Sequence, residues 1–263
     1  MKKLYGTLSV VIPLVIILFC FLGFLVAPND PDVTDVMNKY QSASLTFPFG
    51  TDNMGRCEFS RILAGGWVTI GIVLVGSFIV ALLGSMAGLL LGQSTTVKNV
   101  FLDSILNAVT AIPPIAYLII FIGIWGNSIS TMMVSLTASL ILRMVKLVKT
   151  RTEIEMKKAY IMCAVSCGAS RIRILFGHVL PNISREIVRF LCLSCAEMIM
   201  TISGFSFIGL SLGDDVVDWG SMLSVSRSYM GMKPELLFYP ILFIFLSTLS
   251  FNILGKKLEQ GDK

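Results

Sequence analysis

Long apolar stretches separated by polar segments follow one another along the chain. Their length is the main signal, because an α-helix needs about 20 consecutive apolar residues to cross the hydrocarbon core of a membrane. Backbone groups in lipid must find their hydrogen-bond partners inside the segment, so the stretches are predicted to be helices. We expect an all-α membrane protein with six transmembrane helices, at residues 8–27, 67–92, 105–123, 129–148, 187–210 and 236–254.

The polar residues between the first two stretches predict a boundary. Residues 28–66 are polar and contain several prolines, and apolar positions near their end indicate a short helix on the membrane surface. The chain is therefore expected to divide into 1–66, a first transmembrane helix with an external segment, and 67–263, a five-helix core. The first stretch could instead be a cleaved signal peptide, but its length and the following Pro28 favour a retained helix.

Glycines in the second predicted span and prolines in the third affect how these helices pack and bend. Gly84 and Gly88 lie four positions apart in the second span, a spacing that lets two helices approach closely. Pro113 and Pro114 interrupt the third span, where they remove backbone donors and bend the helix. Such a bend suits a translocation pathway, and a purely structural kink explains it equally well.

Residues 149–185, between the fourth and fifth spans, form the most informative polar segment. Apolar residues recur at helical spacing on either side of Gly168, which predicts two short helices joined by a turn. Gly168 suits the left-handed conformation at a helix end, and Ser170 can cap the helix that follows. Apolar stripes outside the membrane must be buried, either against the protein's own helix ends or in a groove of another protein.

Composition excludes a water-soluble fold. Hydrophobic residues make up 55% of the 263 residues, charged residues make up 14%, and the mean hydropathy is +0.82. With the N-terminus inside, all but five of the 21 Lys and Arg residues lie on the cytoplasmic side, so both termini are predicted to be cytoplasmic. The net charge of +5 then reflects topology and contact with anionic membrane lipid, and no nucleic-acid partner is expected. The five exceptions are Lys39, Arg56, Arg61, Arg227 and Lys233.

Residues that could carry chemistry are few. Cys163 with Cys167, and Cys192 with Cys195, are spaced to share a helix face, but neither pair has a third ligand, so no metal site is expected. The sequence contains no glycine-rich phosphate loop, so ATP must be bound by a partner. It also shows no nucleophile–base pair. We therefore expect no catalytic residue, no bound cofactor and no enzymatic activity of this chain alone.

Three stretches resemble the permeases of ABC importers, in particular the dipeptide/oligopeptide/nickel permease family. They occur in the family's order, and the six-helix layout extends the resemblance to nearly the whole chain. Met162 and Cys163 depart from the family's first triplet, and Cys57 stands where an acid is usual. The matching residues are Ala164, Gly168 and His178-Val179-Leu180-Pro181 in the loop, Phe49-Gly50-Thr51-Asp52-Asn53-Met54-Gly55-Arg56 before the second span, and Ser206-Phe207-Ile208-Gly209-Leu210 with Trp219-Gly220.

The resemblance implies a type I ABC importer permease in the cytoplasmic membrane of a prokaryote. Its partners would be a homologous second permease, two ATPase subunits that carry ATP and Mg, and an extracytoplasmic substrate-binding protein. The loop would dock in a groove of an ATPase and couple ATP binding to alternating access. The residues implicated in this coupling are Tyr160, Cys163, Ala164, Gly168, Ala169, Ser170, Arg171, His178, Leu180 and Pro181.

The substrate is less clearly indicated. Glu197 lies deep in a predicted span and is a candidate for the pathway, together with Pro113 and Pro114, although a structural pairing is the alternative. Residues 202–204 look closer to the nickel branch, so nickel or a metal chelate is expected, with di- or oligopeptides as the alternative. A secondary transporter would need ionisable residues in several spans. The residues expected to face the binding protein are Asp52, Arg56, Asp214, Asp215 and Asp218.

Overall fold

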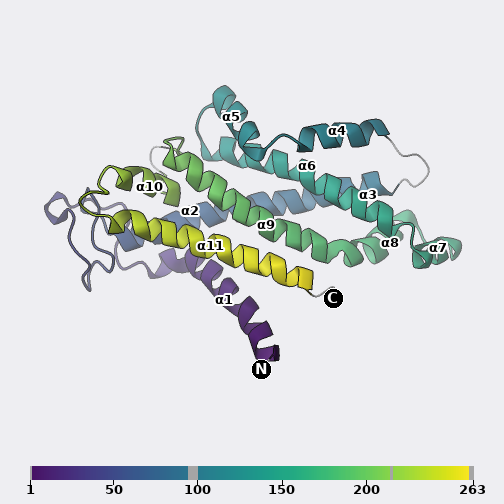
Figure 1. Ribbon diagram of the computed structural model, residues 1–263, viewed down its shortest axis with the longest axis horizontal. Coiled ribbons are helices and arrows are strands. Elements are labelled where there is room, and N and C mark those ends of the chain that lie inside the picture. The colour runs from purple at the N-terminus through teal and green to yellow at the C-terminus, as the bar shows by residue number, and fades with distance from the viewer. Residues whose placement is uncertain (1, 94–99, 214–215, 261–263) are drawn as a thin grey trace. The chain divides into compact units, whose positions relative to one another are not determined.

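The computed structural model describes residues 2–93, 100–213 and 216–260, and this part of the chain is almost entirely helical (Figure 1). Extended pairing within it is limited to one isolated bridge between Thr51 and Cys57. The α-helices are α1 (Lys2–Leu22), α2 (Glu58–Ile79), α3 (Ser85–Gly92), α4 (Val100–Thr110), α5 (Pro114–Trp125), α6 (Ile129–Glu155), α7 (Ala159–Ser166), α8 (Arg171–Ile174), α9 (Leu180–Phe207), α10 (Trp219–Arg227) and α11 (Glu235–Gln260). Short 3₁₀ turns are η1 (Gly23–Val26) and η2 (Val36–Asn38), and π-helical turns are η3 (Val80–Gly84) and η4 (Leu175–Val179).

The helical segments confirm the predicted all-α membrane fold. α4 and α5 count as a sixth span if they are one span, and they are bent by 76° at the break between them. Pro114 is the first residue of α5, a position where the missing backbone donor costs little. The bend at the double proline is therefore confirmed. In the described chain, five segments are long and apolar enough to cross a membrane: Leu8–Val26, Glu58–Gly92, Ile129–Glu155, Arg171–Phe207 and Glu235–Leu258.

The helix before the second span differs from the prediction. α2 begins at Glu58, so residues 58–66 run directly into the span, and the separate surface helix is wrong. Its apolar residues Ile62 and Leu63 are fully buried inside the protein. The sequence pattern was amphipathic because one side of α2 packs on other helices, and periodicity alone does not distinguish such packing from contact with a membrane surface.

The helices around residues 149–185 are also longer than expected. α6 continues to Glu155, and a helical segment runs from Arg171 to Phe207 without ending at Pro181. Pro181 is the second residue of α9, and α9 directly follows the π turn η4. A π turn changes the hydrogen-bond register of a helix locally, and the first turn of the helix after it does not need the donor that proline lacks.

The chain forms two compact units, and α2, α6, α9 and α11 each contribute residues to both. The division into 1–66 and 67–263 predicted from the sequence concerns topology and stays a prediction. The first unit comprises Met1–Leu74, Asn127–Met132 and Cys195–Leu254, and the second comprises Val75–Gly126, Met133–Ser194 and Gly255–Lys263.

Trp219 belongs to the core of the first unit. It is completely buried, and its Nε1 donates a hydrogen bond to the carbonyl oxygen of Ile62 at 2.9 Å. Gly65 and Gly66 make room for the indole, because a Cβ on either residue would lie 3.1–3.2 Å from a ring carbon. The neighbouring Gly220 lies even closer to α9, where an added Cβ would come within 2.3 Å of Ser203 O and 2.6 Å of Ser206 Cβ. The Trp-Gly pair of the sequence therefore fixes the start of α10 against α2 and α9.

A row of glycines packs the second unit. Gly84, Gly88 and Gly92 face α6, and added Cβ atoms would lie 2.5–2.6 Å from side-chain carbons of Met144, Val148 and Thr152, respectively. The predicted close approach between helices is therefore confirmed, with α6 as the partner of α3. Beside it, Lys149 Nζ binds Asp103 Oδ1 at 2.5 Å and Glu153 Oε1 at 2.6 Å, which joins α4 to α6.

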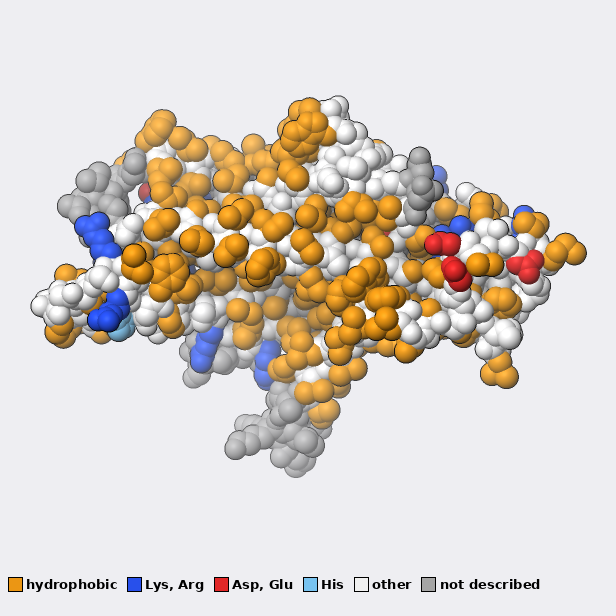
Figure 2. Space-filling view, turned by 180° about the vertical axis from the view of Figure 1, so that it is seen from behind, with side chains coloured by type: hydrophobic (Ala, Val, Ile, Leu, Met, Phe, Trp, Pro, Cys, Tyr) orange, Lys and Arg blue, Asp and Glu red, His pale blue; other side chains and the backbone are white. Residues whose placement is uncertain are grey.

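Large apolar side chains remain exposed over the helices. Figure 2 shows a face that is mainly hydrophobic, with few charged side chains among them. Phe78, Ile119, Ile124 and Phe245 are examples of exposed apolar side chains on helices that are candidate membrane spans or part of the bent pair. Monomeric soluble proteins rarely expose apolar surface on this scale, whereas lipid or other membrane helices cover it without loss.

Candidate functional site

A helical hairpin joins α6 to α9, and its turn is built around Gly168. The φ angle of Gly168 is +79°, a conformation that favours glycine. Gly168 N donates to Val165 O at 2.9 Å, and Ala169 N donates to Ala164 O at 3.0 Å, which together form the hydrogen-bond pattern of a Schellman cap. Ser170 Oγ then accepts from Arg173 N at 3.4 Å as the cap of α8. The predicted turn and cap are both confirmed.

The outer side of the hairpin is apolar and exposed. Ile161 and Ile174 are buried and hold α7 and α8 to the second unit. Ile172 lies between Arg171 and Arg173 in α8 and is 71% exposed. Among the described residues, exposed side chains of α7, α8 and η4 that share this apolar character are Tyr160, Met162, Cys163, Val165, Cys167, Ile172 and Phe176.

Tyr160 connects the hairpin to both neighbouring helices. Its hydroxyl donates to Glu155 Oε1 at 2.5 Å and accepts from Asn182 Nδ2 at 2.9 Å. Burial raises the pKa of the Tyr160 hydroxyl, and the bond to the Glu155 carboxylate raises it further, so Tyr160 keeps its proton and remains the donor. Asn182 Nδ2 also donates to His178 O at 2.8 Å. We call Glu155, Tyr160 and Asn182 the tyrosine clamp.

The remaining loop residues occupy simpler positions. His178 is partly buried, and its ring centroid lies 6.4 Å from that of Tyr160 in an edge-to-face arrangement. Leu180 and Pro181 form the start of α9, and Arg171 is exposed at the start of α8. Glu155 and Asn182 of the tyrosine clamp were missed by sequence reasoning, because their partner lies in a different helix and no periodic pattern marks it.

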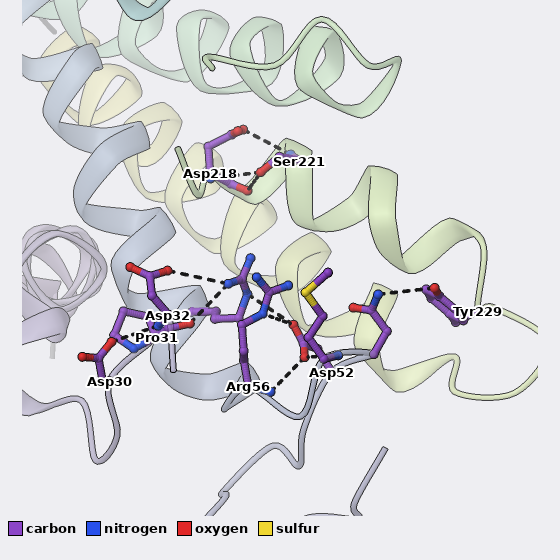
Figure 3. A network of polar contacts seen from close by, with 11 residues as sticks. Asp30, Pro31, Asp32, Asp52, Arg56, Asp218, Ser221 and Tyr229 are labelled. Carbon is purple, nitrogen blue, oxygen red and sulfur yellow. Dashed lines mark hydrogen bonds and ion pairs between the residues drawn. The ribbon is translucent and has the colours of Figure 1, made fainter. Parts of the chain in front are cut away.

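In the first unit, the segment before α2 folds around the carboxylate of Asp52 (Figure 3). Oδ1 accepts hydrogen bonds from the backbone nitrogens of Met54 at 2.8 Å and Arg56 at 2.9 Å. Oδ2 binds Arg56 Nε at 2.7 Å and lies 3.6 Å from Arg61 Nε. Asp52 is nearly buried, so its main effect is to fix the turn 52–56 and to hold two guanidinium groups side by side.

These charged groups line a cleft of about 600 Å³. α2 contributes Glu58 and Arg61, while the preceding turn contributes Asp52 and Arg56. Further lining residues come from the end of α9, the loop after it, α10 and the turn that follows α10, and many of them are small or bear a hydroxyl group. These residues include Ser206, Gly209, Ser211, Gly213, Ser221, Ser224, Ser226 and Tyr229.

Asp218 is buried directly before α10, and its predicted role in facing a binding protein stays a prediction. Its carboxylate caps α10, accepting from Gly220 N at 2.9 Å and Ser221 N at 3.4 Å, while Ser221 Oγ accepts from Asp218 N at 3.1 Å (Figure 3). Asp218 is completely buried, and burial raises the pKa of its carboxyl above the ordinary value although these hydrogen bonds act in the opposite direction. Asp214 and Asp215 lie outside the described residues.

The candidates for the pathway belong to different units of the chain. Glu197 lies in the part of α9 that belongs to the first unit, and its side chain is exposed on the surface of this chain. Pro113 and Pro114 belong to the second unit. A role for these residues in transport stays a prediction.

The matched residues and the fold agree on one class of protein. Residues 81–261 match the protein family described as the inner-membrane component of binding-protein-dependent transport systems, and the chain belongs to this family. A solved structure of the methionine ABC transporter MetNI in an inward-facing conformation shares the fold, with a TM-score of 0.60 and 16% identity over 76% of this chain and 94% of that chain. The architecture is that of a type I ABC importer permease.

Relatives with assigned names extend over most of the chain. The glutathione transport system permease protein GsiD of Pectobacterium atrosepticum is 32% identical over 212 residues, which cover 81% of this chain and 70% of that protein. The GsiD protein of Shigella dysenteriae serotype 1 is 29% identical over 255 residues, covering 97% of this chain and 84% of that protein. Both names refer to glutathione, so these relatives support the dipeptide and oligopeptide side of the family and give the nickel branch no support.

Proposed function

We propose that this chain is the membrane-spanning permease subunit of an importer that moves a short peptide, of the glutathione class, across the cytoplasmic membrane. The subunit does not hydrolyse ATP. Two ATPase subunits supply the energy, a second permease completes the pathway, and an extracytoplasmic binding protein delivers the substrate. The observation that carries this proposal is the exposed apolar hairpin α7–α8, on a chain of this family whose relatives are named for glutathione transport.

The hairpin has the properties expected of a coupling element. Its backbone is fixed by the cap at Gly168, and the tyrosine clamp ties α7 to α6 and α9, so a displacement of α7 is passed to two long helices. Its exposed apolar side chains would be buried in a groove of an ATPase subunit. Helices commonly bind in this way, because apolar side chains at helical spacing share one face that fits into a hydrophobic groove. Arg171 and Arg173 stand beside them and suit an acidic rim of that groove.

A peptide is favoured over nickel for two reasons. The relatives are named for glutathione. In addition, the stretch 202–204, which looked closer to the nickel branch, has a packing role that explains it without a substrate. Ile202 is completely buried, and a Cβ at Gly220 would lie 2.7 Å from Ser203 Cα, so this stretch provides the close contact between α9 and α10.

Coupling can be tested at Gly168 with two substitutions that differ in backbone preference. No atom lies within 4 Å of a Cβ built on Gly168, so a side chain there is limited by the positive φ and not by space. Gly168→Val should weaken the hairpin by about 1–2 kcal/mol, whereas Gly168→Asn is the matched control, because asparagine adopts this conformation more readily. The valine variant should lose co-purifying ATPase subunits while the two permeases stay paired.

The substrate class is tested by uptake. Cells that carry the transporter should accumulate labelled glutathione, and Gly168→Val should reduce the uptake while Gly168→Asn keeps it. The uptake of labelled nickel should not depend on this chain. Nickel uptake that requires this subunit, with glutathione uptake unaffected by its deletion, would contradict the peptide assignment. ATPases that stay bound to the valine variant with full uptake would contradict the coupling role of the hairpin.

A further inference from the structure

One carboxylate in the cleft of the first unit lacks a partner. Glu58 is the first residue of α2 and is only 2% exposed. Its Oε1 is buried and accepts no hydrogen bond from any residue in the described part of the chain. An unsatisfied buried carboxylate oxygen is unfavourable by several kcal/mol in an apolar site, so it needs an explanation.

The charges around Glu58 do not neutralise it. Arg56 is held by Asp52 at 2.7 Å, and Arg61 lies 3.6 Å from Asp52 Oδ2 and 3.9 Å from Asp32 Oδ1. Arg61 Nη1 also donates to Pro31 O at 3.2 Å. The two guanidinium groups are thus engaged by the two aspartates, as Figure 3 shows for Arg56 and Asp52, and the cleft lining holds three carboxyl groups against two guanidinium groups.

A second residue that lines the cleft also has an acceptor without a hydrogen bond. Asn53 Nδ2 donates to Tyr229 Oη at 3.3 Å, but Asn53 Oδ1 is buried and, within the described residues, has no hydrogen-bond partner. Two lining residues therefore offer unused oxygen acceptors. A ligand group that donates several hydrogen bonds and carries positive charge would satisfy both acceptors.

An ammonium group fits this description better than a metal ion. It carries three donors and no acceptor, and its hydrogen bonds to a carboxylate are charge-assisted. Among the described residues, no group of three or more His, Cys, Asp or Glu side chains is arranged to hold a metal ion. The cleft volume of about 600 Å³ lies within the range of small-molecule sites, about 300–1,000 Å³, and its hydroxyl-bearing lining residues suit peptide groups.

We propose that the cleft is a binding site for the substrate inside the permease, and that Glu58 receives the free ammonium group of the transported peptide. This inference rests on the proposed peptide import and adds a specificity-determining residue to it. The ordered aspartate–arginine network keeps the wall of the site in place, and the peptide amine removes the unsatisfied oxygen when it enters. The permease then selects for a free amine independently of the binding protein.

The test compares glutathione with its N-acetylated form, which lacks the ammonium group. The complete transporter is reconstituted in proteoliposomes with the same binding protein for every variant, so the preference of the binding protein cancels. The KM of the wild type should be lower for glutathione than for the acetylated form. Glu58→Gln has nearly the same shape and should raise the KM for glutathione by about tenfold, leaving the acetylated form unchanged.

Two further variants keep the result interpretable. Glu58→Asp retains the charge and should keep a preference for the free amine, although at lower affinity. Asp30→Asn is the control, because Asp30 is an exposed carboxylate near the site that does not line the cleft. A Glu58→Gln transporter that keeps the full preference overturns the assignment, and so does a Glu58→Asp transporter that loses the preference as completely as the glutamine variant.

A second measurement tests the proposed substrate site separately from the proposed import of peptides. Glutathione and N-acetylglutathione are titrated into nanodiscs that contain the two permeases and the ATPases without the binding protein. Binding of glutathione that depends on Glu58, in a transporter that imports neither probe, supports the cleft and refutes the proposed peptide import. Normal uptake together with binding that is equal for both probes, or unchanged in Glu58→Gln, refutes the cleft and leaves the import standing.

Discussion

At the scale of single residues, Asp52 and Asp218 show how burial redirects a carboxylate. Sequence position suggests that both face a binding protein, but Asp52 organises the turn 52–56 and Asp218 caps α10. Each accepts hydrogen bonds from the backbone, which fixes local structure instead of offering charge to a partner. A contribution of these two side chains to docking would therefore act through the shape of the segments that they hold.

Asp218 permits a prediction about stability and pH. Because burial raises its pKa in the folded protein, the folded state holds the proton to a higher pH than the unfolded state does. Stability from this group is thus complete below the ordinary pKa of aspartate and declines as the pH rises through the raised value. Asp218→Asn keeps a capping side chain without the charge, so its thermal unfolding in detergent should lose this decline.

The control for that prediction is Asp218→Ala, which removes the cap of α10. The alanine variant should be less stable than the asparagine variant by about 1 kcal/mol at every pH tested, because the backbone nitrogens of the first turn lose their acceptor. Equal melting temperatures for the two variants would show that the cap contributes nothing. A pH profile of Asp218→Asn that matches the wild type would show that another group causes the decline.

The same scale shows what the sequence could and could not predict. Gly168 and Ser170 were predicted correctly, because a helix cap depends on residues within about five positions along the chain. Trp219, which donates to Ile62 from 157 residues away, could be identified only as part of a resemblance. Glu58 drew no attention, because an unpaired carboxylate is recognised only when its surroundings in space are known.

At the scale of elements, the glycine row of η3 and α3 determines how closely α6 can approach. A Cβ on Gly88 would lie 2.6 Å from Val148 Cβ and 3.0 Å from Val145 O, and neither atom belongs to the end of a flexible side chain. The glycine spacing indicated a close contact, but a small-xxx-small pattern does not name its partner. Only the structure assigns that partner to α6.

This packing gives a prediction with a control in the same long helical segment. Gly88→Ala should destabilise the permease by about 1–3 kcal/mol through overpacking. Gly71→Ala is the control, since its added Cβ would meet only Phe21 at an ordinary 3.7 Å, and alanine favours a helix more than glycine does. Thermal unfolding in detergent should show a lower melting temperature for the first variant and an unchanged or higher one for the second. A lower melting temperature for Gly71→Ala than for Gly88→Ala would show that the glycine row does not determine the packing of α3 on α6.

The lengths of the helices were harder to predict than their existence. Apolar windows identified the spans well, because hydropathy reports the segment that lipid requires. They placed the end of the fourth span at residue 148, whereas α6 continues to Glu155. The additional turns carry charged residues, and these are stabilised by contacts such as the Lys149 pairs with Asp103 and Glu153. Such contacts lie outside any hydropathy window.

At the scale of the whole molecule, the distribution of charge predicts which side of the membrane each segment faces. Most Lys and Arg residues lie on one side if both termini are cytoplasmic, and the hairpin α7–α8 then faces the cytoplasm, where an ATPase can reach it. The cleft of Glu58 belongs with the segment before α2, which in this orientation lies on the external side, where the proposed binding protein would deliver substrate. The proposed function therefore requires the hairpin and residues 28–57 to lie on opposite sides.

Cysteine labelling tests this requirement directly. Cys163 and Cys167 are exposed on the hairpin, while Leu45 is fully exposed in the segment before α2. In membranes that lack the ATPase subunits, a membrane-impermeant maleimide should label the two native cysteines in inside-out vesicles and spare them in right-side-out vesicles. Leu45→Cys, in a chain with serine at positions 163 and 167, should show the opposite pattern. Labelling of both sites from the same side would contradict the proposed topology, in which the hairpin contacts an ATPase and the cleft receives substrate from a binding protein. Protection of Cys163 when the ATPases are restored would connect the exposed apolar face of α7 to the subunit that drives transport.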